Sequence, residues 1–147
     1  DKLGMDRIAA RMQALGLIGT KLRRHMMDTA AARCGEENVS TPAELVRLLQ
    51  AMHGSGPARA GHYLMDDAIE LLKKPKENRL RKGLPEGVAS ADKSGELEGV
   101  RVDAGIVFAK NRPYVLCVMT TFLKDEAEGE RAIESISRVK RSMNPSS

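Results

Sequence analysis

The chain has 147 residues, of which 41% are hydrophobic, 30% charged and 3% aromatic, so it can form one domain with a core of ordinary size. Its 24 Lys and Arg against 20 Asp and Glu give a net charge of +4, and both signs are interspersed, which predicts a solubilising surface. The composition also excludes classes of protein: no apolar run approaches the roughly 20 residues that span a membrane, two cysteines are too few for a disulfide scaffold or a Cys-based metal cage, and the absence of Trp argues against a base-stacking nucleic-acid platform.

The first half of the chain is predicted to be helical, with one long loop. Apolar residues recur at helical spacing between Met5 and Leu15. Residues 17–40 lose this periodicity, which predicts a long surface loop, and loops of this length inside compact domains are often functional. Thr41-Pro42-Ala43-Glu44 then has the pattern of a capping box with Pro at the first helical position, so we expect a helix to begin there.

The second half is predicted to contain a small sheet. Short helices are expected at residues 66–72 and 78–82, and the period then changes. Three runs rich in Val, Ile and Thr, separated by turn residues, predict antiparallel strands in meander order at residues 88–94, 100–109 and 114–122. A last amphipathic helix is expected at 127–143, with an inner face formed by Ala132, Ile133, Ile136 and Val139. This order indicates an α+β fold: N-terminal helices, a three-stranded antiparallel meander and a closing C-terminal helix.

The first predicted strand contains the motif that carries a family resemblance. Residues 91–97 read Ala-Asp-Lys-Ser-Gly-Glu-Leu, and Lys93-Ser94-Gly95 is expected at the end of the strand. The tripeptide resembles the Lys-[Ser/Thr]-Gly motif of the serine β-lactamase and penicillin-binding protein superfamily. The context agrees, because Leu-Pro-Glu-Gly precedes the strand, a meander and a helix follow it, and the Thr-Pro helix start at residue 41 resembles the one that follows the Ω loop of class A β-lactamases.

The resemblance covers essentially the whole sequence but only the C-terminal half of such a domain. We therefore expect residues 1–147 to be one portion of a single domain, with a helical and Ω-loop-like part at 1–86 and the strands plus the last helix at 87–147. In the family, the nucleophilic Ser and its Lys form a Ser-x-x-Lys motif in the first half, and a Ser-Asp-Asn loop lies just upstream of where this sequence begins. The chain alone is therefore expected to be inactive, as the later part of a longer protein or the product of pro-segment removal.

Two Ser-x-x-Lys matches occur within this chain, at Ser90 and at Ser137. Ser90 lies on the first predicted strand and shares its lysine with the Lys-Ser-Gly motif. Ser137 is expected on the exposed side of the last helix. With this many Ser and Lys residues, such matches arise by chance, and we expect neither to be the nucleophile.

The resemblance implies a role for each residue of the motif. Lys93 would hold its ammonium near the substrate carboxylate and the hydroxyl of the Ser-Asp-Asn loop, where its charge would lower the cost of moving a proton. Ser94, with Gly95 beside it, would bind the same carboxylate. The backbone N–H of Glu96 would be one of the two oxyanion donors. The alternative for Lys93 is a solvated lysine at a strand end.

Two residues of the second strand are further candidates. Arg101 could be a second carboxylate anchor, since many class A enzymes carry an Arg on this strand and a guanidinium can reach a carboxylate from nearby positions. The alternative for Arg101 is an exposed hairpin arginine. Asp103 is expected inside the sheet region, where a carboxylate needs a partner, and a structural salt bridge is favoured over a catalytic role.

The predicted loop departs from the class A pattern Arg-x-Glu-x-x-x-Asn. Arg24 matches the arginine, but Met26 falls on the deacylating Glu and Ala30 on the Asn. Met cannot activate the water that clears the acyl-enzyme. Asp28 could do so only if the loop shifts in register. Rapid turnover of β-lactams is therefore not expected, and a slow, penicillin-binding or esterase-like serine hydrolase is favoured.

The remaining polar residues point to neither a metal nor a cofactor. The three His show no ligand spacing. Cys117 is expected to be a small buried hydrophobe, while a reactive-thiol role is open for Cys34. The basic cluster at residues 73–82 is expected to be a solvated helical corner, with phosphate or nucleic-acid contact as the alternative.

Partners and location follow from the resemblance. The expected partner in the complete enzyme is a β-lactam or related acyl substrate, with no nucleic acid and no membrane, and an exported (periplasmic or secreted) location is implied although the sequence shows no signal peptide. The alternative function is a non-catalytic dimerising or partner-binding module. The apolar surface of a half-domain would then favour a homodimer or pairing with the N-terminal half.

Overall fold

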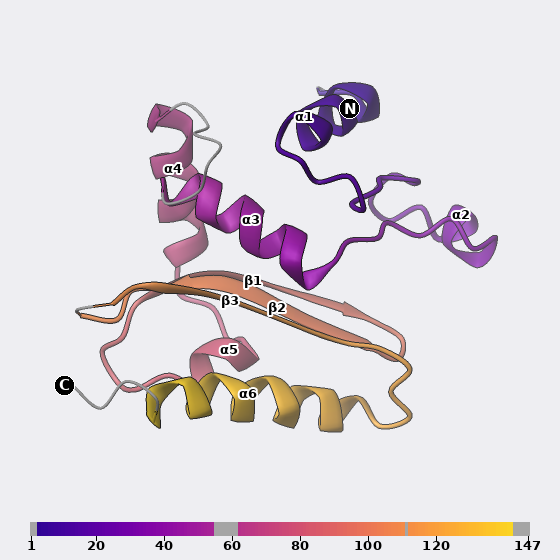
Figure 1. Cartoon of the computed structure of the whole chain (residues 1–147). Coiled ribbons are helices and arrows are strands. Elements are labelled where there is room, and N and C mark those ends of the chain that lie inside the picture. Colours follow the sequence, from indigo (N-terminus) through magenta and orange to yellow (C-terminus); the bar gives the residue numbers. More distant parts are fainter. Residues whose placement is uncertain (1–2, 55–61, 111, 143–147) are drawn as a thin grey trace.

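The computed structural model describes residues 3–54, 62–110 and 112–142, with only the backbone described at 62–64 and 139–142. Within these residues the predicted α+β order is confirmed: helices come first, a meander in the order β1-β2-β3 follows, and a helix closes the fold (Figure 1). The helices are α1 (Met5–Ala14), α2 (Thr29–Arg33), α3 (Pro42–Met52), α4 (His62–Lys73), α5 (Arg79–Lys82) and α6 (Glu126–Ser142). The strands are β1 (Ser90–Leu97), β2 (Val100–Val107) and β3 (Tyr114–Thr120).

The sheet separates two helical layers (Figure 1). Helices α3 and α4 lie over one side, here called the front face, and α5 and α6 lie over the other, the back face. Side chains alternate between the faces along each strand. On β1, residues 91, 93, 95 and 97 belong to the front face and residues 90, 92, 94 and 96 to the back face.

Each face has its own apolar core. On the front face, Leu49 of α3 and Ile69 of α4 pack with Ala91, Ala104 and Ile106 of the sheet. On the back face, a second cluster joins both helices to β2 and β3 through Leu80, Val107, Leu116, Val118 and Ile133. Full burial of a Leu or Ile side chain stabilises a fold by roughly 1.5–3 kcal/mol, so these clusters fix both helical layers to the strands.

Helix α3 begins where the sequence predicts, but its capping box is half formed. The Thr41 hydroxyl accepts a hydrogen bond from the Glu44 N–H at 3.2 Å, which caps the helix. The Glu44 carboxylate does not return to Thr41. It accepts instead from the Gly19 N–H at 2.7 Å and from the Thr20 hydroxyl at 2.6 Å. Glu44 thereby anchors the start of the 17–40 segment to α3.

The 17–40 segment is more ordered than its lost periodicity predicts. Helix α2 lies within it, capped by the Asp28 carboxylate, which accepts from the Ala31 N–H at 2.9 Å. Lys21 and Val39 exchange two backbone hydrogen bonds at 2.9 and 3.0 Å and close the segment at its base. The prediction of a long surface loop missed α2, because a five-residue helix is too short to show periodicity in the sequence.

Helix α6 shows two corrections to the predicted inner face. Ile133 is fully buried as predicted, but Ile136 is 43% exposed. Ser137, predicted on the exposed side, is fully buried and donates to the Leu80 carbonyl at 2.8 Å. The reason is that residue 137 lies four positions after Ile133 and therefore shares its face. The side chain of Val139 and the predicted helix end at Met143 lie outside the described residues.

Helices α5 and α6 approach each other closely at Gly83. A Cβ on Gly83 would lie 2.4 Å from the Glu134 carbonyl oxygen and 2.6 Å from the Ser137 Cβ. Such distances are well inside van der Waals contact, so a larger residue at this position would push the two helices apart. No helix among the described residues is both long and apolar enough to cross a membrane.

Candidate functional site

The Lys93-Ser94-Gly95 motif lies inside β1 rather than at its end. The strand continues to Leu97, which pairs with Val100 of β2 across a two-residue turn. The predicted turn at residues 95–99 was too long, because Gly95 keeps its place in the ladder opposite Val102. Pairing with β2 therefore continues along β1 both before and after the motif.

The direction of the backbone hydrogen bonds shows which groups of β1 are open. The Phe108 N–H donates to the Ala89 carbonyl at 2.9 Å, so these opposed residues form a hydrogen-bonded pair. Such pairs alternate with non-bonded ones along an antiparallel ladder. Ser94, opposite Asp103, and Glu96, opposite Arg101, therefore fall in the non-bonded positions. Their N–H and C=O groups point away from β2, towards the edge of β1 that has no strand beside it among the described residues.

A groove of about 460 Å³ runs between this part of the sheet and the 17–40 segment. Residues 93–97 of β1 form one wall, and Arg24, Met26 and Asn38 contribute to the other. The Lys93 side chain is exposed, and its ammonium hydrogen-bonds the Ser94 carbonyl. The structure thus brings Lys93, Ser94, Gly95, Glu96 and Arg24 of the predicted site together at one groove.

The loop wall of the groove is closed by an ion pair. Nε and Nη2 of Arg24 lie 3.0 and 2.8 Å from Oε2 of Glu37. Met26 is 83% exposed and lines the groove, whereas Asp28 caps α2 and is not among the lining residues. The two acidic residues that line the groove both have ion-paired carboxylates: Glu37 pairs with Arg24, and Glu96 pairs with Arg79 on the back face.

Arg101 does not line the groove. Its guanidinium lies on the back face, where it bonds Glu126 and lies 3.2 Å from Glu130 of α6. It also donates to the carbonyls of Leu97 and Val100 at 2.9 and 2.8 Å. The alternative of an exposed hairpin arginine is wrong, because only 7% of Arg101 is accessible.

Asp103 belongs to a buried polar cluster behind the motif. Its carboxylate accepts from the Leu80 N–H at 3.0 Å and from the Asn78 amide at 3.4 Å. Burial raises the pKa of Asp103 to about 6, and the nearby Asp92 carboxylate also raises it. The salt bridge expected for Asp103 is found on Asp92 instead, where Arg81 Nε lies 2.7 Å from the carboxylate.

Sequence comparison now identifies the family. Residues 1–140 match the model of a protein family described as "Beta-lactamase enzyme family". The chain belongs to this family.

Solved structures agree with the assignment. A β-lactamase from Sphaerobacter thermophilus superposes with a TM-score of 0.82 at 26% identity, over 97% of this chain and 54% of that one. A class A β-lactamase from Mycobacterium abscessus gives 0.81 at 23% identity, over 97% and 56%. A PBP-A variant, solved as an acyl-enzyme complex with penicillin G, gives 0.82 at 23% identity, over 96% and 52%. The search of curated proteins found no match.

The length of these relatives bears on the fold assignment. Our β-lactamase family chain spans about half the length of the structures it matches. Its sheet and helices therefore form half of a β-lactamase fold, as the resemblance predicts.

The basic cluster of this family member is only in part the solvated corner that was predicted, because Lys74 and Lys82 are exposed but the two arginines are paired. Arg79 pairs with Glu96 at 2.5 Å and Glu130 at 2.6 Å. Arg81 bonds Asp92 and also donates to the carbonyls of Leu72, Lys73 and Ser90. Both arginines therefore join elements of the fold through ion pairs and hydrogen bonds. Sequence reasoning missed this role, and the Asn that caps α5 ahead of them is the one local signal of an ordered corner.

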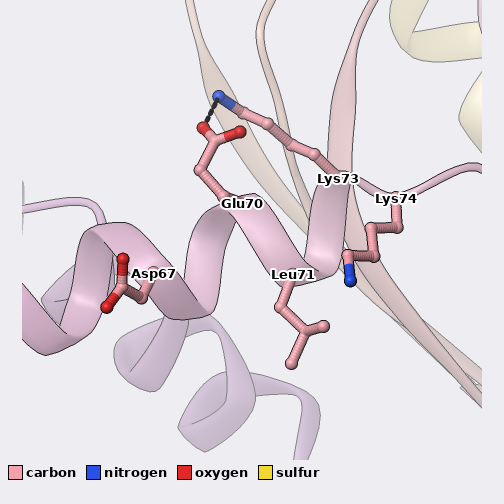
Figure 2. Close-up of a pocket in the computed structure, with 5 residues that line it drawn as sticks. All are labelled: Asp67, Glu70, Leu71, Lys73 and Lys74. Carbon is pink, nitrogen blue, oxygen red and sulfur yellow. Dashed lines mark hydrogen bonds and ion pairs between the residues drawn. The ribbon is translucent and has the colours of Figure 1, made fainter.

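The described side chains of the pocket on α4 and the two cysteines show no arrangement that would bind a ligand. Figure 2 shows a shallow pocket on α4 with its side chains spread apart, and within it Lys73 pairs with Glu70 at 2.7 Å. Burial raises the pKa of the Cys117 thiol to about 11, so it packs as a small apolar group, whereas Cys34 is exposed. Among the described residues, no three His, Cys, Asp or Glu side chains gather where they could hold a metal ion.

Proposed function

We propose that this chain forms the Lys-Ser-Gly wall of the active site in a β-lactamase-like serine hydrolase. Such an enzyme transfers the acyl group of a β-lactam, or of a related amide or ester, to a serine and then hydrolyses the acyl-enzyme. The single observation that supports this proposal is the open edge of β1. There the Lys93 ammonium, Ser94 and the outward N–H of Glu96 lie beside one groove.

Each group has a task in the proposed reaction. The ammonium of Lys93 attracts the substrate carboxylate, and the hydroxyl of Ser94 donates a hydrogen bond to it. The N–H of Glu96 donates to the oxygen that becomes negative when the serine attacks the carbonyl. The serine itself is proposed to come from the rest of a longer polypeptide, because the matching structures are about twice as long as this chain. The chain alone is then inactive.

The proposed enzyme releases its acyl group slowly. Hydrolysis of an acyl-enzyme needs a base that takes a proton from water. Met26 lines the groove at the position where the class A pattern has that base, and the carboxylates of the acidic lining residues Glu37 and Glu96 are engaged by arginines. We therefore propose a penicillin-binding behaviour, in which the acyl-enzyme accumulates. An exported location is part of the same proposal and rests on the family.

Intact-mass spectrometry after incubation with penicillin G tests the proposal. The 16.0 kDa chain alone is expected to gain no adduct, and a longer polypeptide that also carries the family's serine motif is expected to gain one penicillin. In that polypeptide, Lys93→Ala is expected to slow acylation by about 100-fold, because a charged group aimed at the transition state is lost. Lys124→Ala, at an exposed bend outside the groove, is the matched control.

Two outcomes would contradict the proposal. An adduct on the 16.0 kDa chain alone would place the nucleophile within these residues. Failure of the longer polypeptide to acylate with penicillin G or a thioester substrate would remove the serine hydrolase assignment for this protein.

A further inference from the structure

A chain of charged side chains lies behind the tip of the β1–β2 hairpin and has no part in the proposed chemistry. It starts at Glu96, whose backbone N–H faces the open edge of β1 while its side chain belongs to the back face. Arg79 of α5 holds the Glu96 carboxylate at 2.5 Å and, with its other terminal nitrogen, the Glu130 carboxylate of α6 at 2.6 Å. One arginine therefore ties β1 to both helices of the back face.

The second half of this network holds the turn itself. Arg101 shares the Glu130 carboxylate, bonds Glu126 and donates to two carbonyls that flank the turn. Glu126 in addition accepts from the Gly99 N–H at 3.4 Å. The hairpin tip is thus held through its side chains and its backbone by groups that begin on α6.

The free edge of β1 explains why this anchoring matters. A strand with one neighbour has ladder hydrogen bonds on one side only, so its tip can twist and fray. The Glu96 N–H lies one residue before the last paired position, where ladder support is weakest. A donor at such a position serves as an oxyanion donor only if it is held within a fraction of an ångström of its productive place. The Arg79–Glu96 pair supplies an additional attachment from the back face of the sheet.

We propose that Arg79 is a positioning residue: through the Glu96 carboxylate it fixes the backbone N–H of Glu96 at the open edge of β1, where that N–H serves as the oxyanion donor. The role of the Glu96 N–H as an oxyanion donor rests on the proposed function. The position of that N–H rests on the ion pairs alone. It assigns to Glu96 a side-chain role distinct from the role of its backbone.

The charge state of Glu96 agrees with this assignment. The hydrogen bond from Arg79 lowers the pKa of Glu96 below its usual value. The carboxylate therefore stays ionised, and the tether stays formed, down to a pH below the usual pKa of a glutamate. The tether is lost as the pH falls through this lowered pKa.

Amide hydrogen exchange on the full 147-residue chain, followed by NMR, tests the tether without any substrate. The Glu96 N–H faces solvent, so the flanking Gly95 and Leu97 amides, which bond to β2, report the opening of the tip. Arg79→Met and Glu96→Ala are each expected to lower their protection about tenfold, while Leu116 in β3 keeps its protection. Glu98→Ala, in the exposed turn two residues away, is the matched control and is expected to change protection less than about twofold.

Two further readouts separate positioning from general stability. The pKa of Glu96, followed by the NMR shift of its carboxylate carbon, is expected to rise towards its usual value in Arg79→Met and to be partly restored in Arg79→Lys. In the longer polypeptide with the serine motif, Arg79→Met is expected to lower the acylation rate constant about tenfold and to leave the dissociation constant for penicillin unchanged.

The outcomes distinguish the two proposals. Unchanged protection of Gly95 and Leu97 in both Arg79→Met and Glu96→Ala would overturn the tether. A tether confirmed by exchange in a protein that never acylates would leave the positioning of the N–H intact and contradict the serine hydrolase function instead. Equal loss of protection at Leu116 would show that Arg79 only stabilises the whole fold, which also overturns the inference.

Discussion

The two faces of the small sheet use their charged groups in opposite ways. On the back face, the arginines and carboxylates that meet the strands pair with one another, and the Asp92 and Asp103 side chains are fully buried. On the front face, the strands bury apolar side chains under α3 and α4, and towards the hairpin they leave Lys93 exposed in a groove. The same three strands therefore carry a rigid, internally satisfied side and an open, cationic one.

This difference explains how the short strand β1 can leave one edge and an exposed lysine open to a groove. A backbone edge and an exposed lysine add little stability by themselves. Helix α6 and the buried polar cluster, on the opposite face, provide the contacts that hold the strand in place. The substitutions below disturb one face at a time, and their effects decide whether the two faces are as different as their contacts indicate.

Arg101→Met is expected to have the largest effect on stability. The substitution removes a nearly buried guanidinium, so two hairpin carbonyls lose this donor, and Glu126 and Glu130 each lose one of their donors. The carboxylate partners are partly exposed, but the guanidinium is nearly buried and holds the hairpin turn to α6 through several hydrogen bonds at once, so we expect the midpoint of thermal unfolding to fall by about 10 °C. Calorimetry of the chain measures it, with Arg112→Met, an exposed arginine in the β2–β3 connection, as control. Equal shifts for both would contradict the special role of the back face.

Asp103→Asn is expected to stabilise the chain at neutral pH. Raising the pKa of Asp103 from 3.8 to about 6 costs the folded state about 3 kcal/mol at pH 7. The folded carboxyl binds its proton more tightly than the unfolded one, so stability falls as the pH rises from about 4 to about 6. An Asn keeps the acceptor for the Leu80 N–H without the charge, and we expect the unfolding midpoint at pH 7 to rise by about 5 °C.

The measurement for Asp103→Asn is a series of thermal unfolding curves between pH 4 and pH 8. The difference from the parent chain is expected to grow from about pH 4 to about pH 6 and to level off above that. Asp67→Asn, exposed on α4, is the control and is expected to follow the parent at each pH. A destabilisation that does not vary with pH would show that the carboxylate is a required acceptor and not a source of cost.

Glu44→Ala tests the front face, where the 17–40 segment forms the outer wall of the groove. The substitution removes the acceptor for the Gly19 N–H and the Thr20 hydroxyl. We expect a fall of about 4 °C in the unfolding midpoint and faster exchange of the Gly19 amide, because the segment is tied to α3 at few points. Glu36→Ala, an exposed carboxylate of the same segment, is the control.

The pH dependence of the same tie has the opposite sign to that of Asp103. Hydrogen bonds from Thr20 and then Gly19 lower the pKa of Glu44. Its contribution is therefore fully present above the usual pKa of a glutamate and is lost as the pH falls through the lowered value. Protection of the Gly19 amide that does not decrease at low pH would contradict the anchoring role.

The parts of this fold that the sequence predicts are those that local patterns encode. The Thr41 cap, the three strands joined by short turns and the position of α5 follow from neighbours within a few residues, and the structure confirms them. The errors share a cause as well. Ile136 and Ser137 were assigned to the wrong sides of α6 because the spacing from Ile133 allows burial of either residue, and the close approach of α5 at Gly83, which favours Ser137, is a contact that no local pattern contains.

The site shows the same limit more clearly. Lys93, Ser94 and Gly95 were found through a motif of adjacent residues. The partners of Arg79, Arg81 and Arg101 lie up to 51 residues away in sequence, so a basic stretch at residues 73–82 looked solvated when its arginines are in fact paired. The sequence shows which side chains are charged, but only the fold shows which of them are paired with a side chain of opposite charge.

Met26→Glu is the smallest expected effect and the direct test of the open face. Met26 lines the groove with an exposed side chain. Among the described groove residues the arginine is Arg24, and it already pairs with Glu37, so we expect a carboxylate at position 26 to remain unpaired. Under the proposed function, this carboxylate can take a proton from water near the acyl group. We expect deacylation of the penicillin adduct in the longer polypeptide to speed up about tenfold, well below the 10²–10⁴-fold of a fully positioned base, since Ala30 provides no amide to orient the water.

The neighbouring residue provides a matched control for this substitution. Met27 is 85% exposed and is not among the residues that line the groove, so Met27→Glu adds the same charge to the same segment at a different place. Loss of the adduct is followed by intact mass over time. Acceleration in Met26→Glu alone would show that the position facing the groove limits turnover. Equal acceleration in both variants would mean that charge on the segment matters and not its place, and no acceleration in either would show that slow release has a cause outside this wall of the groove.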